Sequence, residues 1–428
     1  MPSILANITI PLVGIVDTAI VGHLSDASAI GGIAIGTMLF DLLYWNFGFL
    51  RIGTSGLTAQ AYGAGLRDEC ARIFDRSITL ASVGAVFVWA IQWLFVTLVL
   101  AVVPCSDEVA SIAREYFFVR VIAAPATLSL MAFKGWFIGM QDTKSPMATD
   151  ILVNVVNMVA SYCLAVYTPL GVVGVAWGTV IAQFSGLILA FVLLARRYPD
   201  VWAQCRSAKA MRESMKWSEL RSMMKLNGNL FIRSLCFMVV YVGFTSLAGT
   251  YGDIQLAVSS ILMKLFMFFS YFVDGFAYAG EALVGKEWGK FKITNNELRI
   301  TAVVKALFGW SIGVGVIFTA VYWLWGNECL ALMTDKREVL EAVQPFMGWL
   351  IAMPIVSALA FMWDGIYVGA TAGVPIRNAM IWAAAAFVAA YAATYRFCGP
   401  QALYIAYFAH LGARVIYLTL KWKKVKNI

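Results

Sequence analysis

Ile10–Pro11–Leu12–Val13–Gly14–Ile15–Val16–Asp17–Thr18–Ala19–Ile20–Val21–Gly22–His23 is an apolar stretch of helix length that carries a single carboxylate, Asp17, near its middle. Such a stretch predicts a membrane-spanning helix. An ionised and unpaired carboxylate in hydrocarbon costs several kcal/mol, so we expect Asp17 to face a cavity and to be able to bind a proton. Pro11 cannot donate to the carbonyl of Asn7, which predicts a kink. A polar residue hydrogen-bonded between helices is the simpler interpretation of Asp17.

The composition of the whole chain is that of a membrane protein. Hydrophobic residues make up 61% and charged residues 13%, with a mean hydropathy of +0.78, whereas about a quarter of a soluble domain is charged. We expect the first span to be retained rather than cleaved, and a short segment to precede it. Twelve spans, each long enough to cross a bilayer, are predicted at 2–22, 29–60, 78–103, 112–140, 146–168, 171–195, 226–250, 254–285, 300–326, 338–370, 376–396 and 400–421.

The positive charges orient these helices. Most Lys and Arg residues lie in loops after even-numbered spans, in the polar segment 196–225 and in the tail after 420. By the positive-inside rule, those loops and both termini are predicted to be cytoplasmic. Topology therefore explains the formal net charge of +8, and we expect the lipid bilayer but no nucleic acid among the partners.

The two halves of the chain resemble each other. Ala29–Ile33 aligns with Ala257–Ile261, Pro125 falls near Pro354, and the loop from Gly139 falls near the loop from Gly369. The predicted domains are an N-terminal six-helix bundle (1–195), a cytoplasmic linker (196–225) and a C-terminal six-helix bundle (226–428). Two such halves suit alternating access around an axis along the membrane normal. A channel would more often assemble several subunits, whereas we expect a monomer.

Polar residues follow one face of the fifth predicted span. Asp150, Asn154, Asn157 and Ser161 are spaced by four, three and four residues, which places them on a common helix face. Thr179, on the sixth span, is a candidate to face the same space. Such a stripe either forms interhelical hydrogen bonds or lines a cavity.

Other charged residues lie inside the remaining spans. Asp41 is paired with Lys134 or has a role in transport. Asp274 and Glu281 share a face of the eighth span. Either structural salt bridges or a role in transport would explain this group, which consists of Asp274, Glu281 and Asp364 with the cations Lys264, Lys305 and Arg414.

Catalytic patterns are missing from the sequence. We find no nucleophile–base arrangement, no phosphate-binding glycine loop and no metal-ligand spacing, and the seven cysteines are scattered. We therefore expect no enzyme activity and no cofactor, and a transport process driven by an ion gradient or running downhill.

Several motifs resemble the multidrug and toxic compound extrusion (MATE) transporters. Pro11, Asp17, Thr18 and Gly22 look like the first helix of that family. Leu50–Ala64 and Asp274–Gly285 are similar to its DinF branch, and two further motifs match it, Gly139-x-Gln141–Asp142–Thr143-x-x-Pro146 and Gly171-x-x-Gly174-x-Ala176. The resemblance covers the whole chain in order.

The resemblance implies two bundles of six helices, a bacterial inner-membrane location, and efflux of organic, often cationic, compounds in exchange for H⁺ or Na⁺. Asp17 matches the first-helix aspartate that this branch protonates, and Asn157 and Thr179 match its polar partners. Ser161 stands where the family commonly has Asp. Asp364 resembles the acid that the NorM branch uses for Na⁺, but 226–250 lacks the glutamate expected there.

These observations together predict a secondary antiporter for small organic molecules that couples to H⁺ rather than to Na⁺. The alternatives are a flippase for a lipid-linked precursor, which would need a cationic cleft, and a membrane sensor or channel. Cation or proton coupling is predicted at Asp17, Asn157, Ser161 and Thr179. A substrate-facing or gating role is predicted for Asp41, Lys134, Asn154, Lys264, Asp274, Glu281 and Asp364.

Overall fold

The protein is helical throughout the part of the chain that the computed structural model describes. The described residues are 27–103, 105–205, 207, 213–294, 297–334 and 336–426. They contain no strand, and eleven of their helical segments are long and apolar enough to cross a membrane. These segments coincide with eleven of the twelve predicted spans. The remaining one, 2–22 with Asp17, lies outside the described residues. The predicted all-α membrane architecture is confirmed.

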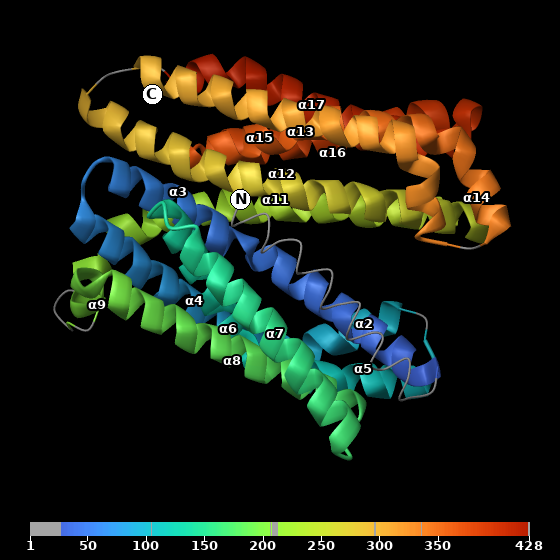
Figure 1. Ribbon diagram of the computed structural model, residues 1–428, viewed down its shortest axis with the longest axis horizontal. Helices are drawn as coiled ribbons and strands as arrows, with labels where there is room; N and C mark the ends of the chain where they lie inside the picture. The colour runs from blue at the N-terminus through green and yellow to red at the C-terminus, as the bar shows by residue number, and fades with distance from the viewer. Residues whose placement is uncertain are drawn as a thin grey trace. The chain divides into compact units, whose positions relative to one another are not determined.

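The chain divides into two compact units, Met1–Met224 and Lys225–Ile428. The described helices of the first unit are α2 (Ala27–Tyr44), α3 (Phe49–Gly63), α4 (Arg67–Val102), α5 (Asp107–Arg120), α6 (Ala124–Gly139), α7 (Lys144–Tyr167), α8 (Val172–Arg197) and α9 (Pro199–Cys205), with short 3₁₀ turns at Trp45–Gly48 and Val121–Ala123 (Figure 1). The 3₁₀ turns interrupt two of the predicted spans, and Pro125 lies in the first turn of α6, where its missing N–H costs no hydrogen bond.

Helix α6 lies at the centre of the first unit. It packs against α3, α4 and α8. The side chain of Trp136 on α6 is fully buried, and its indole N–H donates to the carbonyl of Cys70 on α4 at 2.8 Å. A buried indole needs such an acceptor, so this contact fixes α6 against α4.

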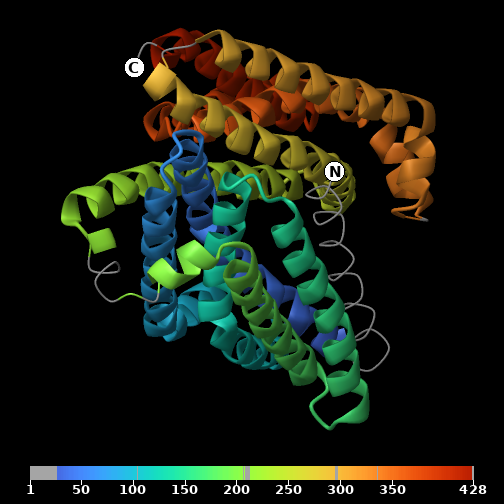
Figure 2. The ribbon, with the colours of Figure 1, turned by 60° about the vertical axis from the view of Figure 1, so that its left-hand side comes forward.

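The second unit begins within α11 (Trp217–Gly249), at Lys225. It continues with α12 (Asp253–Thr294), α13 (Glu297–Ala331), α14 (Arg337–Val343), α15 (Met347–Gly369), α16 (Gly373–Cys398) and α17 (Gln401–Lys426), with a 3₁₀ turn at Gln344–Phe346. Its central helix is α15, which packs against α12, α13 and α17. Met362, Ile366 and Tyr367 on α15 are fully buried. Figure 2 shows how the chain reverses from the long α13 through the short α14 into this central helix.

The repeat is visible at the level of single contacts within each unit. A Cβ atom added to Gly135 of α6 would lie 2.2 Å from the carbonyl oxygen of Arg51 on α3, and one added to Gly365 of α15 would lie 2.4 Å from that of Ala277 on α12. Only glycine permits so close a backbone approach. The same helix pair is therefore packed in the same way in both halves of the chain.

The turns that follow these two central helices also match. Gln141 has φ +64° and Thr371 has φ +52°, the left-handed conformation that commonly ends a helix. The amide of Asp142 then donates to the carbonyl of Phe137 at 2.9 Å, and that of Ala372 donates to the carbonyl of Tyr367 at 3.0 Å. The two turns differ in one respect, because only the first carries a carboxylate after the left-handed residue.

The segment predicted as a linker, 196–225, is partly helical. It contains α9 and the first turns of α11, which begins at Trp217 rather than at 226. Arg76 on α4 is buried; its Nε donates to the carbonyl of Ser214 at 2.8 Å, and its Nη1 lies 2.9 Å from Glu69. The segment just before α11 is thus fixed to α4 by a charged hydrogen bond.

Candidate functional site

Three of the predicted coupling residues meet inside the first unit, where α7 packs on α8. The side-chain amide of Asn157 donates from Nδ2 to Oγ1 of Thr179 at 2.9 Å. The hydroxyls of Ser161 and Thr179 each donate to the carbonyl of Val175 at 3.3 Å. Asn157, Ser161 and Thr179 are all buried. We call these three residues the α7–α8 polar cluster.

A glycine on α8 brings these side chains together. A Cβ atom added to Gly178 would lie 2.4 Å from Oγ of Ser161 and 2.5 Å from its amide nitrogen. Because Gly178 has no side chain, α7 approaches α8 closely enough for Asn157 to reach Thr179, which follows Gly178 directly. The turn between the helices includes Gly171 at φ +49°, a conformation that favours glycine.

The cluster presents an acceptor that no other described residue uses. Oδ1 of Asn157 is buried and, among the described residues, has no hydrogen-bond partner. A buried polar atom without a partner costs about 1–3 kcal/mol, so this carbonyl oxygen suits a proton donor or a cation. Asp17, the fourth predicted coupling residue, lies outside the described residues.

Lys134 of α6 forms an ion pair with Asp150 of α7. Its Nζ lies 2.6 Å from Oδ2 of Asp150. We expected Asp41 either to pair with Lys134 or to have a role in transport; it lies on α2 and is exposed. Asn154, the next polar residue along α7, is half-buried.

In the second unit, Asp364 of α15 is bound by two arginines. Nε of Arg233 on α11 donates to its Oδ2 at 3.2 Å, and Nε of Arg414 on α17 donates to its Oδ1 at 3.1 Å. The Nη2 groups of both arginines also donate to Oδ2. The carboxylate and Arg414 are buried, while the side chain of Arg233 retains 19% of its exposure. Arg414 was one of the predicted cations, whereas Arg233 was missed.

Arg233 could have been found as the one charged residue of the predicted span 226–250, because such a charge needs a partner in the membrane. The repeat adds a second contrast. Lys134 directly precedes Gly135 and Asp364 directly precedes Gly365, the two glycines of the matched helix contacts. The same position thus carries a cation in the first unit and an anion in the second, and each is paired within its own unit.

The other predicted residues of the second unit lie on α12. Lys264 is exposed, Asp274 is half-buried and Glu281 is buried. Glu281 lies on the side of α12 that faces α15, since a Cβ added to Gly369 of α15 would lie 2.8 Å from its carbonyl oxygen. Among the described residues, no three His, Cys, Asp or Glu side chains gather closely enough to hold a metal ion.

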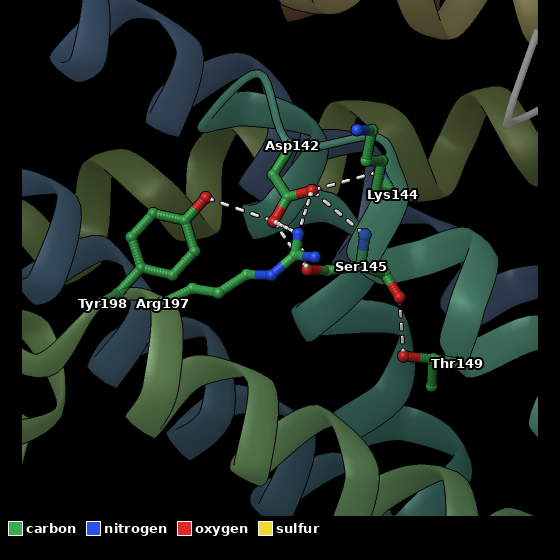
Figure 3. Close-up of polar contacts among 6 residues, drawn as sticks. All are labelled: Asp142, Lys144, Ser145, Thr149, Arg197 and Tyr198. Atoms are coloured by element: carbon green, nitrogen blue, oxygen red, sulfur yellow. Dashed lines mark hydrogen bonds and ion pairs between the residues drawn. The ribbon is translucent and has the colours of Figure 1, made fainter.

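A second polar cluster, absent from the predicted site, lies where α6, α7 and α8 end or begin (Figure 3). Oδ1 of Asp142 accepts the main-chain N–H groups of Lys144 and Ser145, both at 3.0 Å. Its Oδ2 accepts from the hydroxyl of Ser145 at 2.6 Å and from Nη1 of Arg197 at 3.0 Å. The hydroxyl of Tyr198 donates to the same oxygen at 3.3 Å. One carboxylate therefore caps the start of α7 and holds the end of α8.

The electrostatics of this cluster favour the ionised carboxylate. Burial alone would raise the pKa of Asp142, but the hydrogen bonds from Ser145 and Arg197 and the positive charge of Arg197 outweigh burial and hold that pKa below its ordinary value. Burial, followed by the negative charge of Asp142, raises the pKa of Tyr198. Asp142 was recognised as part of a family motif, yet its contact with α8 depends on helix packing that no local pattern encodes.

Comparison with known proteins places the sequence beside membrane transporters. The family model MatE matches residues 2–163 and 230–395. The chain is 31% identical, over 425 residues, to DNA damage-inducible protein F of Escherichia coli strain K12, an alignment that covers 99% of this chain and 90% of that protein. It is 23% identical over 354 residues to the probable multidrug resistance protein NorM of Thermotoga maritima, with 80% of this chain and 72% of that protein covered.

The fold is shared with solved structures as well. A structure described as the outward-facing conformation of a multidrug resistance MATE family transporter of the MOP superfamily superposes with a TM-score of 0.89. The superposition covers 100% of this chain and 94% of that chain at 15% sequence identity. At this identity the likeness concerns the fold alone.

Proposed function

The chain belongs to the MatE family of multidrug and toxic compound extrusion transporters, and from this premise we propose that it exports organic cations in exchange for protons. It is a membrane-embedded, multi-pass protein. We further propose that it acts as a monomer in a bacterial inner membrane, with both termini in the cytoplasm as the distribution of Lys and Arg suggests.

The observation that carries proton coupling is the chemistry of the α7–α8 polar cluster. Among the described residues, this cluster offers one amide and two hydroxyls but no carboxylate. A hard cation such as Na⁺ favours several oxygen ligands, carboxylates above all, whereas a proton needs one acid. We assign that role to Asp17, whose protonated carboxyl would be a donor suited to the unpartnered Oδ1 of Asn157.

Contacts in the second unit also support coupling to protons rather than to Na⁺. Asp364, which resembles an acid used for Na⁺ in the NorM branch, is bound by Arg233 and Arg414. Two guanidinium groups already provide the positive charge that a bound cation would supply. We therefore assign Asp364 a structural role.

One ion pair bears on the alternative of a flippase for a lipid-linked precursor. A pyrophosphate group would require available cations. Of the cations considered for such a group, Lys134 contacts Asp150, whereas Lys264 on α12 and Lys305 on α13 are exposed. Arg233 and Arg414 contact Asp364. Substrate roles for the predicted residues Asp41, Asn154, Lys264, Asp274 and Glu281 remain part of the proposal.

The test is ethidium transport by the purified full chain in proteoliposomes. We expect a pH gradient, but not a Na⁺ gradient, to drive ethidium uphill. Asp17→Asn keeps the size of the protonated side chain but cannot release a proton, so it should abolish uphill transport. The control Asp107→Asn, an exposed acid at the start of α5, should transport normally. A normal ethidium gradient with Asp17→Asn would contradict the proposal.

A further inference from the structure

Three charged residues of the second unit form a buried group with an uneven charge. Arg233 of α11 and Arg414 of α17 both contact the carboxylate of Asp364 on α15. A guanidinium group stays protonated in proteins, and two such groups stabilise the ionised form of the carboxylate between them. The group, which we call the Arg–Asp–Arg triad, therefore has one positive charge in excess.

Contacts with other described residues do not balance this excess charge. The ion pairs of both arginines are with Asp364, and among the described residues neither Asp274 nor Glu281 of α12 contacts them. The aromatic ring of Phe361 lies 5.4 Å from Cζ of Arg414 and attracts it, but the ring has no net charge. Because a charge without a counter-ion is costly inside a membrane, the triad favours an additional anion.

The contacts with Asp364 leave N–H groups of both arginines for a further ligand. Arg233 donates to the carboxylate from Nε and Nη2, and Arg414 donates from the same two nitrogens. Nη1 of each arginine is also a donor, and it has no acceptor among the described residues. The side chain of Arg233 retains 19% of its exposure, so the chain does not cover it completely. A ligand can therefore contact Arg233 without displacing Asp364.

The depth and the charge of the triad indicate the class of anion. Its three residues lie six or seven positions inside the ends of the predicted spans 226–250, 338–370 and 400–421, which corresponds to about 9–11 Å of helix. The phosphate of a lipid headgroup lies outside the hydrocarbon core, so this depth favours a small molecule over a lipid. One excess charge matches a monovalent anion better than a pyrophosphate. The N–H groups of a guanidinium suit the two oxygens of a carboxylate.

We propose that the Arg–Asp–Arg triad binds one small monocarboxylate anion through the N–H groups of Arg233 and Arg414 that Asp364 does not use. The anion supplies the negative charge that the triad lacks, while Asp364 stays in place as the fixed counter-ion. This site goes beyond the proposed exchange of organic cations for protons. It depends on residues of the second unit, whereas the proposed proton coupling depends on the α7–α8 polar cluster of the first.

The test is thermal unfolding of the purified full chain in a non-ionic detergent, with sodium acetate as the probe. Acetate replaces the bulky anion of the buffer MES at constant pH and constant sodium concentration, so that ionic strength does not change. A ligand that binds only the folded protein raises its unfolding temperature by an amount set by its concentration and its Kd. We expect acetate to raise the unfolding temperature of the wild type in this way.

The charge of the triad predicts how the variants respond. Arg233→Gln leaves the neutral pair of Arg414 and Asp364, so the apparent Kd for acetate should rise by about tenfold or more, the factor that corresponds to a lost charged hydrogen bond. Asp364→Asn has a larger excess of positive charge and should bind acetate more tightly than the wild type. The control Arg396→Gln removes an exposed charge from the last turn of α16 and should respond as the wild type does.

A second variant guards against poor folding. Arg414→Met also leaves a neutral pair, that of Arg233 and Asp364, and replaces Arg233→Gln in the comparison if that protein is unstable. If Asp364→Asn gives too little folded protein, the wild type and the neutral-pair variant decide the question.

Three outcomes overturn the proposal. The first is that acetate does not raise the unfolding temperature of the wild type. The second is an equal effect of acetate on Arg233→Gln and on the wild type, which would place the bound acetate elsewhere. The third is stabilisation of the wild type by added phosphatidylglycerol but not by acetate, with loss of this effect in Arg233→Gln, which would assign the triad to a lipid headgroup. Ethidium transport driven by a pH gradient is measured separately, so failure of this site and failure of the proposed antiport are distinguishable.

Discussion

Nε of Arg414 on α17 lies 3.1 Å from Oδ1 of Asp364 on α15, and both side chains are buried. Arg233 of α11 contacts the same carboxylate. Three helices of the second unit therefore converge on one negative charge. Arg233 and Arg414 carry two positive charges, whereas Asp364 carries one negative charge. This imbalance predicts which substitution lowers the stability of the protein more.

Asp364→Asn should destabilise the protein more than Arg414→Met. The first substitution leaves two neighbouring guanidinium groups without a counter-ion, a loss of about 3–5 kcal/mol for a broken buried pair. The second leaves the neutral pair of Arg233 and Asp364. Thermal unfolding of the detergent-purified variants shows which of the two is less stable. A larger loss of stability with Arg414→Met than with Asp364→Asn would contradict this prediction. If Asp364→Asn folds normally but loses all ion dependence, the coupling site belongs in the second unit.

Gly365→Ala should weaken the contact between α12 and α15. The added Cβ would lie 2.4 Å from the carbonyl oxygen of Ala277, so the helices must separate, at a cost of about 1–3 kcal/mol. The matched control is Gly412→Ala on α17, where an added Cβ meets no atom within 4 Å. This control should gain up to about 1 kcal/mol from helix propensity. Equal unfolding temperatures for both variants would show that the close approach is not required.

Ser161→Asp should fail to fold efficiently, although the resemblance to MATE transporters suggested Asp at this position. Ser161 is fully buried, and its Oγ lies against the backbone of Gly178, so a carboxylate has no room. Ser161→Ala should cost only about 1 kcal/mol, because Val175 O still accepts from Thr179. Folded yield by size-exclusion chromatography tests both. Normal folding of Ser161→Asp with new Na⁺-dependent transport would show that the cluster adapts to a second acid.

Asp142 should stabilise the protein at neutral pH and lose this effect in acid. Its pKa in the folded protein lies below the ordinary value of 3.8, so the ionised form favours folding. The contribution is present above the unfolded-state pKa and disappears as the pH falls through the lower folded-state pKa. Asp142→Ala should lower stability at pH 7 by about 2 kcal/mol through the lost helix cap and charged hydrogen bonds.

Asp142→Asn provides the control for that measurement, because its amide oxygen can still cap α7 but carries no charge for Arg197. Asp142→Asn should lower stability at pH 7 less than Asp142→Ala does. Unfolding temperatures recorded from pH 7 to about pH 2 should show the difference between wild type and Asp142→Asn staying constant near neutral pH and narrowing once the pH falls below the ordinary pKa of 3.8. A difference that widens instead would mean that the carboxylate is protonated in the folded protein.

The sequence by itself determined the membrane class, the described spans and the repeat. These depend on apolar runs and on the order of helices, prolines and loops, which are local properties of the chain. The i, i+4 and i+7 spacing likewise predicted that Asp150, Asn154 and Asn157 share a helix face, since a helix has a fixed period. The motif around Asp142 was also visible, because it is continuous in sequence.

The partners of the charged residues were decided only by tertiary structure. Lys134 could be matched with Asp41 or with Asp150 on charge alone, and the packing of α6 against α7 selected Asp150. Arg233 and Asp364 are 131 residues apart, and no local period links such positions. The space around the side chain of Ser161 depends on Gly178, which lies on another helix. Residues of opposite charge can pair at any separation in the sequence. The packing of the helices therefore decides which charged side chains come into contact.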